Sequence, residues 1–223
     1  MTVLVVGGRG GIGAATVRLL ERDGTDCAVL DRADGVDAAD PQQVRGYLAG
    51  NGITELSAVV VLAGRAGSGG IDDTDIDQWR GLMRDNLDSA YVVIRESLPL
   101  LRAFPGDRSI VLLSSVNGRH GGNNLSGPAY ATAKAAILGL TRHLAVTLAA
   151  EGIRVNAIAP GPVETPMLHR LSTQERAGLL RAIPLGHTAE PAEIAGTVRF
   201  LLSPSAASIT GAVIDVNGGM WVG

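Results

Sequence analysis

Short apolar runs recur along the chain, separated by longer stretches in which apolar residues follow a helical period. Each run is apolar throughout and rich in β-branched residues, as is typical of strands buried on both faces of a parallel sheet. The runs predict strands at residues 3–6, 27–30, 59–62, 110–113, 153–158 and 212–216. A further short strand ending at Asp37 would bring the sheet to about seven strands.

The stretches between these runs predict helices at residues 11–23, 41–49, 75–98, 129–150 and 191–202. Pro41 and Pro191 both fit the first turn of a helix, where the N–H that proline lacks would have no partner. Residues 160–190 follow no strong period and contain several prolines, so they are predicted to form a lid over a site. The order strand, helix, strand favours an α/β fold. We therefore expect a single Rossmann-type domain over residues 1–223, in which helices flank both faces of a doubly wound parallel sheet.

The composition supports a compact soluble protein. Hydrophobic residues make up 46% of the chain and charged residues only 18%, which suits a large core. A net charge of -3 gives no electrostatic reason to expect nucleic acid or an anionic membrane as a partner. The chain begins in an apolar strand without the features of a signal peptide, and no apolar run approaches the roughly 18 residues of a membrane span. With a lone Cys27, these features predict a cytoplasmic location.

A glycine-rich turn, Gly7-Gly8-Arg9-Gly10-Gly11-Ile12-Gly13, follows the first predicted strand and opens the first predicted helix. Glycine in such a turn lets the backbone approach a pyrophosphate at the positive end of the helix. A glycine cluster elsewhere would indicate only a flexible loop. In this position, Gly7, Gly11 and Gly13 predict nucleotide binding, and Arg9 and Ile12 lie within the same turn.

Charged residues after the second strand bear on the choice of nucleotide. Asp31 ends this strand, where its carboxylate could accept hydrogen bonds from the adenosine ribose hydroxyls of NAD and would repel the 2'-phosphate of NADP. Arg32 and Arg9 could instead attract that phosphate, so NADP stays an alternative. Asp37 could accept a hydrogen bond from the adenine amino group if a strand ends there.

Four polar residues suggest the chemistry. Tyr130 and Lys134 are four apart on a predicted helix, so the phenol and the ammonium share one face. A nearby positive charge favours the phenolate and makes tyrosine a better base, although this spacing alone is common on helix surfaces. Ser115 follows a strand at the edge where open α/β sheets bind ligands, and Asn86 interrupts a helical pattern in which it has poor propensity.

Two other kinds of chemistry are not indicated. The four histidines are scattered without metal-ligand spacing, so we expect no catalytic metal. No Gly-x-Ser-x-Gly turn is present to make Ser115 a covalent nucleophile. Redox chemistry is therefore favoured over hydrolysis.

Taken together, these motifs resemble the classical short-chain dehydrogenase/reductase family from the first strand to the last. Asn86, Ser115, Tyr130 and Lys134 match the catalytic tetrad of that family in order. Residues 156–161 with Thr165 are similar to its nicotinamide-side motif, and Gly211 with residues 216–219 to its C-terminal strand signature. One departure lies after the fourth strand of the family pattern, where Asn-Asn-Ala-Gly is replaced by Val61-Leu62-Ala63-Gly64, so we expect altered local bonding there.

The resemblance implies a role for each member of the tetrad. Tyr130 would exchange a proton with the substrate oxygen, and Lys134 would bind the nicotinamide ribose and lower the pKa of the tyrosine. Ser115 would orient the substrate oxygen, and the backbone carbonyl of Asn86 would hold a water that connects Lys134 to solvent. The resemblance also assigns cofactor contacts to Ala63, Gly64, Pro160, Gly161, Val163 and Thr165.

These implications lead to an oxidoreductase that interconverts a secondary alcohol and a ketone with NAD. An NADP-dependent 3-ketoacyl-type reductase and a non-catalytic NAD(H)-sensing regulator are the alternatives. Related enzymes join through the helices that carry Asn86 and Tyr130, so a homo-oligomer, either a tetramer or a dimer, is expected. The arginines and histidine of the site region, Arg65, His169, Arg170 and Arg181, raise the further hypothesis of an anionic substrate.

Overall fold

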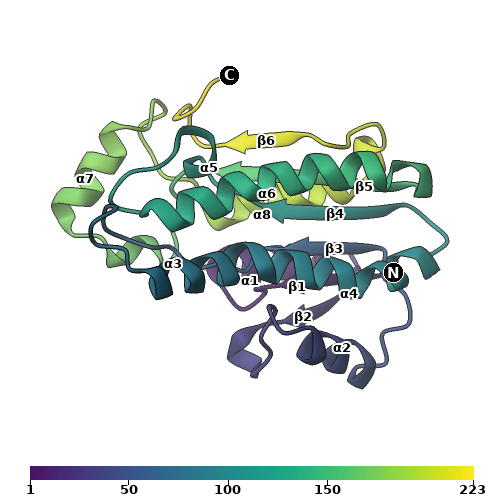
Figure 1. Ribbon diagram of the computed structural model, residues 1–223. Coiled ribbons are helices and arrows are strands. Elements are labelled where there is room, and N and C mark those ends of the chain that lie inside the picture. The colour runs from purple at the N-terminus through teal and green to yellow at the C-terminus, as the bar shows by residue number, and fades with distance from the viewer.

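The strands form one parallel sheet at the centre of the molecule (Figure 1). The computed structural model describes residues 1–223. Its strands are β1 (Thr2–Val6), β2 (Asp26–Leu30), β3 (Ala58–Val61), β4 (Arg108–Leu113), β5 (Ile153–Pro160) and β6 (Val213–Val216). They lie in the order β2-β1-β3-β4-β5-β6, and every neighbouring pair is parallel. The predicted doubly wound α/β fold is confirmed.

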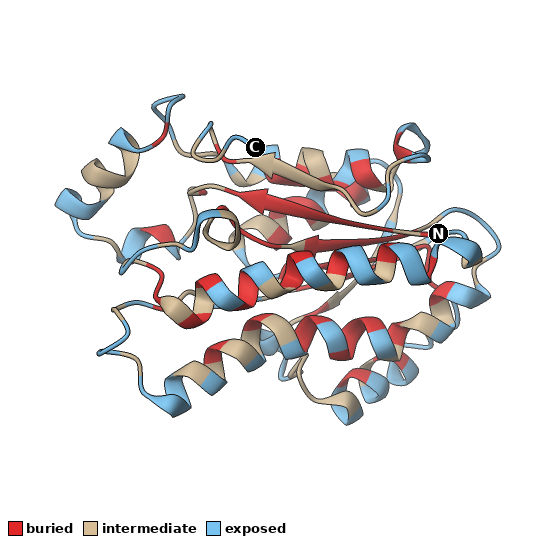
Figure 2. Cartoon of the chain, turned by 45° about the horizontal axis from the view of Figure 1, so that its top comes forward, coloured by how far each residue is buried: buried red, intermediate tan, exposed pale blue.

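Alternate residues of each inner strand face opposite layers of helices, because successive side chains of a strand point to opposite faces. On β1, Leu4 and Val6 join one buried cluster, and Val3 and Val5 join the other. The first cluster lies beneath α2 (Pro41–Gly50), α4 (Ser89–Ala103) and α6 (Pro128–Thr147), and the second beneath α1 (Gly11–Arg22) and α8 (Pro191–Leu202). Figure 2 shows the buried strands between helices that bury only their inner sides.

The remaining helical elements are short and lie mostly in connections. They are α3 (Ile76–Met83), α5 (Asn117–His120) and α7 (Thr173–Arg181), a π-helical turn η2 (Arg84–Asp88), and the 3-10 turns η1 (Arg32–Asp34), η3 (Ala149–Glu151), η4 (Leu168–Arg170) and η5 (Pro204–Ala206). No helix combines the length and apolarity needed to cross a lipid bilayer.

The sheet has six strands, and the prediction of about seven was wrong at Asp37. The segment around this residue bonds to itself and to the next helix. The Asp37 N–H donates to Oε1 of Gln43 at 2.8 Å, and the Asp37 carboxylate accepts the N–H of Ala39 at 3.0 Å. Because these polar groups are satisfied locally, they need no neighbouring strand.

Two helical predictions also needed correction. The helix expected at residues 75–98 is divided into α3 and α4 by the η2 turn, which contains Asn86. The predicted lid contains an unpredicted helix, α7, whose first turn is closed by reciprocal bonds between Ser172 and Glu175. A capping box of this kind is readable in sequence. Sequence reasoning missed this helix because it searched for an apolar period, and a helix without buried residues does not need one.

The topology leaves a crevice beyond the carboxyl ends of the strands. The chain runs from β1 outward to β2 and then returns to β3 on the other side of β1. At such a switch point the connections leave in opposite directions, which opens a ligand site at the carboxyl ends of the strands. The predicted site residues follow these strand ends.

Candidate active site

A cavity of about 650 Å³ opens at the carboxyl ends of the strands. Its walls come from the segments after β1 to β5, from the predicted lid and, after β6, from Met220. The four tetrad residues Asn86, Ser115, Tyr130 and Lys134 all line it. So do all the residues predicted to contact the cofactor: Gly7, Arg9, Gly11, Ile12, Gly13, Asp31, Arg32, Asp37, Ala63, Gly64, Pro160, Gly161, Val163 and Thr165.

The glycine turn forms a cradle that side chains would fill. Gly7 has a φ of +80°, and a Cβ there would lie 2.7 Å from the backbone nitrogen of Ala63. A Cβ on Gly13 would collide with the carbonyl oxygen of Gly7. Gly10 is the N-cap residue of α1 and has no side chain that could accept a hydrogen bond from the helix. The first N–H groups of α1 therefore remain available to an anion. These residues fit the pyrophosphate of a dinucleotide.

At the end of β2, the carboxylate of Asp31 is held by backbone donors. One oxygen accepts the N–H of Arg9 and the other accepts the N–H of Ala33, both at 2.9 Å. The two nearby guanidinium groups are occupied by other carboxylates. Arg9 Nε donates to Asp34 at 3.0 Å, and Arg32 Nη2 donates to Asp85 at 2.9 Å.

Asp37 lies at the same end of the cavity and is strongly bonded. Burial alone would raise the pKa of its carboxyl, but the Ala39 N–H and the Arg84 guanidinium outweigh burial and lower it. The Arg84 contact is 2.7 Å long. Asp37 is therefore a fixed anion at the wall where the sequence predicted an adenine contact.

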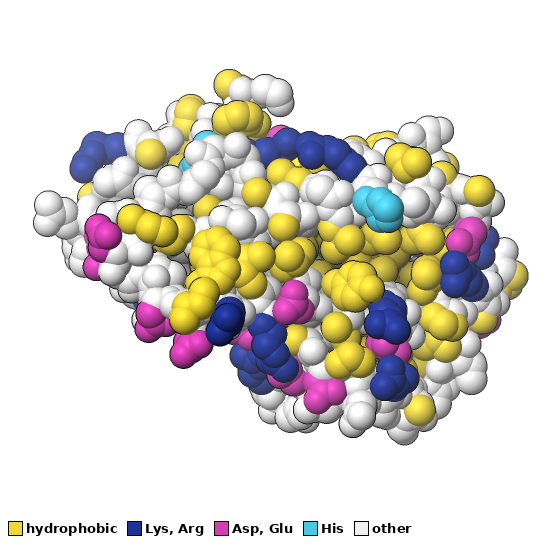
Figure 3. Space-filling model, in the orientation of Figure 1, with side chains coloured by type: hydrophobic (Ala, Val, Ile, Leu, Met, Phe, Trp, Pro, Cys, Tyr) yellow, Lys and Arg dark blue, Asp and Glu magenta, His cyan; other side chains and the backbone are white.

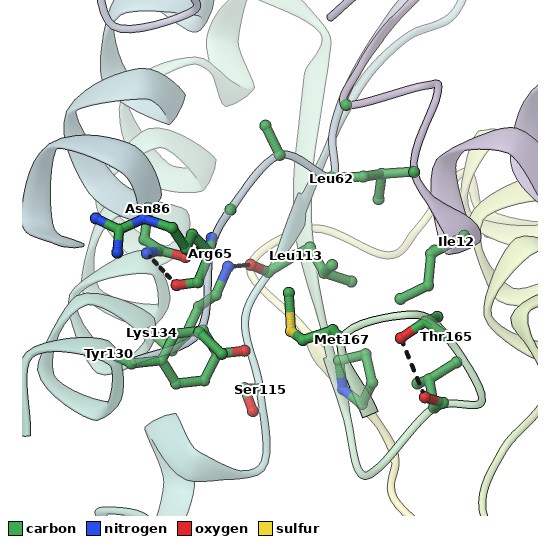
Figure 4. A pocket seen from close by; sticks show the side chains of 18 of the residues that line it. Ile12, Leu62, Arg65, Asn86, Leu113, Ser115, Tyr130, Lys134, Thr165 and Met167 are labelled. Atoms are coloured by element: carbon green, nitrogen blue, oxygen red, sulfur yellow. Dashed lines mark hydrogen bonds between the residues drawn. The ribbon is translucent and has the colours of Figure 1, made fainter. Parts of the chain in front are cut away.

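Lys134 is enclosed on α6, with only 2% of its surface exposed. Its Nζ atom donates a hydrogen bond to the carbonyl of Leu113 at 2.8 Å, and no carboxylate pairs with it (Figure 4). Burial without a counter-ion lowers the pKa of this lysine to about 8. Sequence reasoning missed Leu113, since a backbone carbonyl carries no side-chain signal.

Tyr130 and Ser115 point into the same space (Figure 4). Burial raises the pKa of the Tyr130 phenol, while the Ser115 hydroxyl and the positive charge of Arg170 act in the opposite direction. The Ser115 hydroxyl oxygen accepts the N–H of Asn117 at 3.1 Å, which fixes its position at the end of β4. The site therefore contains a weakly acidic phenol beside a fixed hydroxyl, an arrangement suited to proton exchange.

Asn86 is 1% exposed and holds the segment that follows β3. Its amide nitrogen donates to the carbonyls of Arg65 and Leu82 at 2.9 Å, and its oxygen accepts the Arg65 N–H at 3.2 Å. A Cβ on Gly64 would lie 2.5 Å from that oxygen and 3.2 Å from Lys134 Nζ. Asn86 thus fixes the backbone beside the lysine, and the water relay through its own carbonyl stays a prediction.

The predicted lid, residues 160–190, packs directly on the glycine turn. A Cβ on Gly11 would lie 2.7 Å from the methyl group of Thr165. Glu164 ties the lid together, since its carboxylate bonds to Arg176 at 2.6 Å, to His169 at 2.8 Å and to Thr188 at 3.2 Å. The structure therefore brings the cofactor cradle and the lid into contact.

Of the four residues suggested to bind an anionic substrate, Arg65 and Arg170 line the cavity, and His169 and Arg181 do not. Arg65 Nε donates to Asp85 at 2.8 Å, and in Figure 4 its guanidinium points away from Tyr130. Arg181 does not line the cavity, whereas Arg170 does. No group of three or more His, Cys, Asp or Glu side chains is arranged to hold a metal ion.

Comparisons with known proteins agree with this geometry. The profile of a family described as enoyl-(acyl carrier protein) reductase matches residues 35–221. A cis-4-hydroxycyclohexanecarboxylate dehydrogenase from Sinomonas cyclohexanicum is 34% identical over 97% of this chain and 94% of its own length. A 3-oxoacyl-[acyl-carrier-protein] reductase from Vibrio harveyi is 34% identical over 98% of this chain and 96% of its own length. The chain belongs to the short-chain dehydrogenase/reductase family.

Solved structures of short-chain dehydrogenases/reductases share the same fold. An oxidoreductase of this family from Burkholderia thailandensis is 31% identical, with a TM-score of 0.88 over 100% of this chain and 93% of the other. A 3-oxoacyl-[acyl-carrier protein] reductase from Brucella melitensis with bound NAD is 26% identical, with a TM-score of 0.90 over 100% of this chain and 91% of the other. The resemblance predicted from the motifs is confirmed. This short-chain dehydrogenase/reductase is an NAD(P)-dependent oxidoreductase that interconverts an alcohol and a ketone.

Proposed function

We propose that Tyr130 is the proton-exchanging group of an NAD-linked dehydrogenase/ketoreductase that acts on a secondary alcohol. The observation that carries this proposal is the meeting of the Tyr130 phenol, the Ser115 hydroxyl and the Lys134 ammonium beside the glycine cradle. A bound nicotinamide would supply the acceptor or donor of the hydride. The protein itself would then have to provide a path for the proton and a group that stabilises negative charge on the substrate oxygen.

The three side chains would divide that work. In the oxidation, Tyr130 as the phenolate takes the proton of the substrate hydroxyl, and in the reduction the phenol returns it. Ser115 donates a hydrogen bond to the substrate oxygen and stabilises the negative charge that develops there. Lys134, fixed by Leu113, holds the ribose and supplies a positive charge that favours the phenolate. Thr165 and the backbone near Gly161 would hold the carboxamide.

The preference for NAD is supported by the arrangement of charges around Asp31. Its carboxylate lies where the ribose would bind and would repel a 2'-phosphate. The guanidinium groups of Arg9 and Arg32, which could attract that phosphate, are paired with Asp34 and Asp85. Thermal shift with each cofactor tests this: NAD should stabilise the protein at lower concentration than NADP, and the reverse order would overturn the assignment.

A cyclic secondary alcohol is the proposed substrate class. The relative from Sinomonas cyclohexanicum is named for a ring alcohol, and Leu125, Met167, Leu171 and Met220 give this cavity an apolar wall. The relative from Vibrio harveyi is named for a 3-oxoacyl chain on a carrier protein, so a 3-ketoacyl-type reductase is the second candidate. A panel of cyclic alcohols and 3-oxoacyl thioesters, followed by the absorbance of the reduced cofactor, separates the two.

The decisive variant is Tyr130→Phe, which removes the phenol and keeps the ring. We expect turnover to fall by a factor on the order of 10³ or more, while NAD binding measured by calorimetry stays within about threefold. Tyr91→Phe is the matched control, because Tyr91 is exposed on α4 and does not line the cavity. Substantial activity in Tyr130→Phe would refute the assignment. Tight NADH binding without turnover of any alcohol or ketone would instead support the regulator.

We also infer that the protein forms a homo-oligomer, a tetramer or a dimer, through α4 and α6. Tyr91 and Val146 are 53% and 80% exposed on these helices, and hydrophobic side chains gather on this face (Figure 3). Ala135 and Gly139 give α6 an exposed outer side without bulk, which allows another helix to approach. Sedimentation velocity tests this, and a monomer at micromolar concentration would contradict it. The proposed location is the cytoplasm, where the free Cys27 would stay reduced.

A further inference from the structure

The positive charges in the cavity are distributed unevenly. Four arginines line it, namely Arg9, Arg32, Arg65 and Arg170. The first three lie toward the cofactor end, and each is paired with a carboxylate at 3.0 Å or less. Arg170 is the exception, because no Asp or Glu lies within ion-pairing distance of it.

Arg170 ends the η4 turn of the lid and reaches across the cavity. Its Nη2 atom donates to the backbone carbonyl of Leu125 at 2.6 Å, in the loop before Tyr130. A guanidinium carries five N–H donors, and this bond is its only one to protein. Arg170 and Tyr130 line the same cavity, and the positive charge of Arg170 opposes the burial that raises the pKa of the Tyr130 phenol. The carboxylate of Glu175 lies near enough to be affected by Arg170, but it is bonded to Ser172.

No acidic residue lines the end of the cavity where Arg170 lies. Asp31, Asp37 and Asp85 are the acidic residues that line the cavity, and all three belong to the cofactor end. The lid and the loop that carries Leu125 contribute apolar lining residues, namely Leu125, Met167, Leu171 and Leu179, together with the neutral polar residues Asn123 and Ser126. A charged group with unused donors in an apolar wall fixes the orientation of a ligand, and a guanidinium does this best for a carboxylate, which it can bind through two parallel bonds.

We propose that Arg170 binds a carboxylate on the substrate, so that the enzyme oxidises hydroxy acids of carbocyclic or comparable apolar skeleton and reduces the matching keto acids. The inference rests on the proposed function. A bound NAD⁺ would accept the hydride of the alcohol carbon, Tyr130 would take the hydroxyl proton and pass it to solvent, and the carboxylate would be unchanged. The apolar skeleton spans the distance between the carboxylate at the lid and the reacting carbon at Tyr130.

The test compares substrates that differ only in charge. We would measure kcat/KM for hydroxycyclohexanecarboxylates, their methyl esters and cyclohexanol with NAD⁺. The wild-type enzyme should favour the carboxylates over the esters by about 10- to 100-fold, as expected for a hydrogen-bonded charge pair in an apolar site. Arg170→Gln, which keeps a donor for the Leu125 carbonyl, should remove that preference, mainly through KM, so that kcat/KM falls at least tenfold more for the acids than for the esters.

The matched control is Arg181→Gln, which makes the same change of charge on the lid outside the cavity and should leave both rates unchanged. Arg170→Lys keeps the charge without the two-pronged geometry and should retain part of the preference. Equal losses for acid and ester in Arg170→Gln would overturn the proposal, because they would mean that Arg170 only holds the lid. A wild-type preference for neutral alcohols or for carrier thioesters would overturn it as well.

A binding measurement separates this inference from the proposed function. Cyclohexanecarboxylate has no hydroxyl to oxidise, so its binding to the NADH-loaded protein, followed by calorimetry, does not depend on turnover. Binding that weakens at least tenfold in Arg170→Gln and not in Arg181→Gln would support the carboxylate site even if the chemistry were reassigned. Equal binding to wild type and Arg170→Gln would refute the site. In that case, activity on neutral alcohols that is lost in Tyr130→Phe would leave the proposed function intact.

Discussion

The Nζ atom of Lys134 lies 5.7 Å from the centre of the Tyr130 ring, within a buried site that provides it with no counter-ion. Its hydrogen bond to the Leu113 carbonyl replaces only part of the hydration that an ammonium has in water. The protein thus maintains a costly charge beside a phenol, which is expected where function and stability are in conflict.

Replacing Lys134 with Met should therefore stabilise the protein while abolishing turnover. The native pKa of about 8 lies below the ordinary value of 10.5. This shift corresponds to roughly 3 kcal/mol, from which about 1 kcal/mol is subtracted for the lost hydrogen bond. At pH 7 we expect the variant to be more stable by about 1–3 kcal/mol in urea unfolding.

The sign of the pH dependence provides a second check on Lys134. Between pH 8 and 10.5 the native state releases the proton of this lysine, while the unfolded state keeps it. The unfolding free energy of the wild type should therefore rise relative to that of Lys134→Met across this window, and the difference should shrink by pH 10. A gap that stays constant from pH 7 to pH 10 would contradict the buried charge.

The Ser115 hydroxyl should influence the pH at which kcat/KM for alcohol oxidation rises. Burial raises the pKa of Tyr130 and the Ser115 hydroxyl opposes that rise, so removing the hydroxyl leaves the phenol harder to ionise. The oxidation needs the phenolate. The rising limb of kcat/KM against pH should therefore move to higher pH in Ser115→Ala, with a loss of about 10² in rate.

Ser126→Ala is the control for this shift, because the Ser126 hydroxyl donates to the Asn123 carbonyl in the same loop. It should leave the midpoint of the limb unchanged. If both serine variants moved the midpoint equally, the effect would belong to the loop and not to the Ser115 hydroxyl.

The carboxylates near β2 should set the cofactor preference together. Asp31→Asn removes the charge that repels a 2'-phosphate, and Asp34→Asn releases the Arg9 guanidinium to bind it. We expect the ratio of kcat/KM for NADP to that for NAD to rise by about 10-fold or more in the first variant and further in the double variant. Asp26→Asn, at the opposite end of β2, should not change this ratio.

Two glycine substitutions should have opposite effects on stability. A Cβ at Gly13 collides with the Gly7 carbonyl, so Gly13→Ala should distort the cradle, weaken NAD binding at least tenfold and lower stability by roughly 1–3 kcal/mol. A Cβ at Gly46, within α2, meets nothing within 4 Å. Gly46→Ala should raise stability by about 0.5–1 kcal/mol. Calorimetry with NAD and thermal unfolding measure both effects, and a Gly13→Ala protein that binds NAD normally would contradict the close packing.

The sequence was most informative where chemistry and local structure coincide. The glycine turn, Asp31, Ser115 and the Tyr130–Lys134 spacing each combine a residue type with a place at the end of a strand or on a helix, so they could be predicted. Asn86 was found as an anomaly in a helical pattern. Its hydrogen bonds to Arg65, a residue distant in the chain, could not be predicted from a local pattern.

Other features were beyond sequence reasoning for physical reasons. The absent strand at Asp37 reflects competition between strand pairing and local bonds to Ala39 and Gln43, which composition does not decide. Helix α7 rests on its capping box rather than on burial, so periodicity could not reveal it. Met220 enters the cavity only because β6 pairs beside β5, a long-range contact.

That pairing has a consequence for biosynthesis. The cradle for the dinucleotide comes from β1, α1 and β2, which are synthesised before the other elements of the sheet. The nicotinamide end requires β6, because the Gly161 N–H donates to the Val216 carbonyl at 2.9 Å, and a Cβ on Gly161 would lie 2.9 Å from the Cα of Asn217. We expect a nascent chain to form the dinucleotide cradle before the nicotinamide end, which is complete only once β6 has paired with β5.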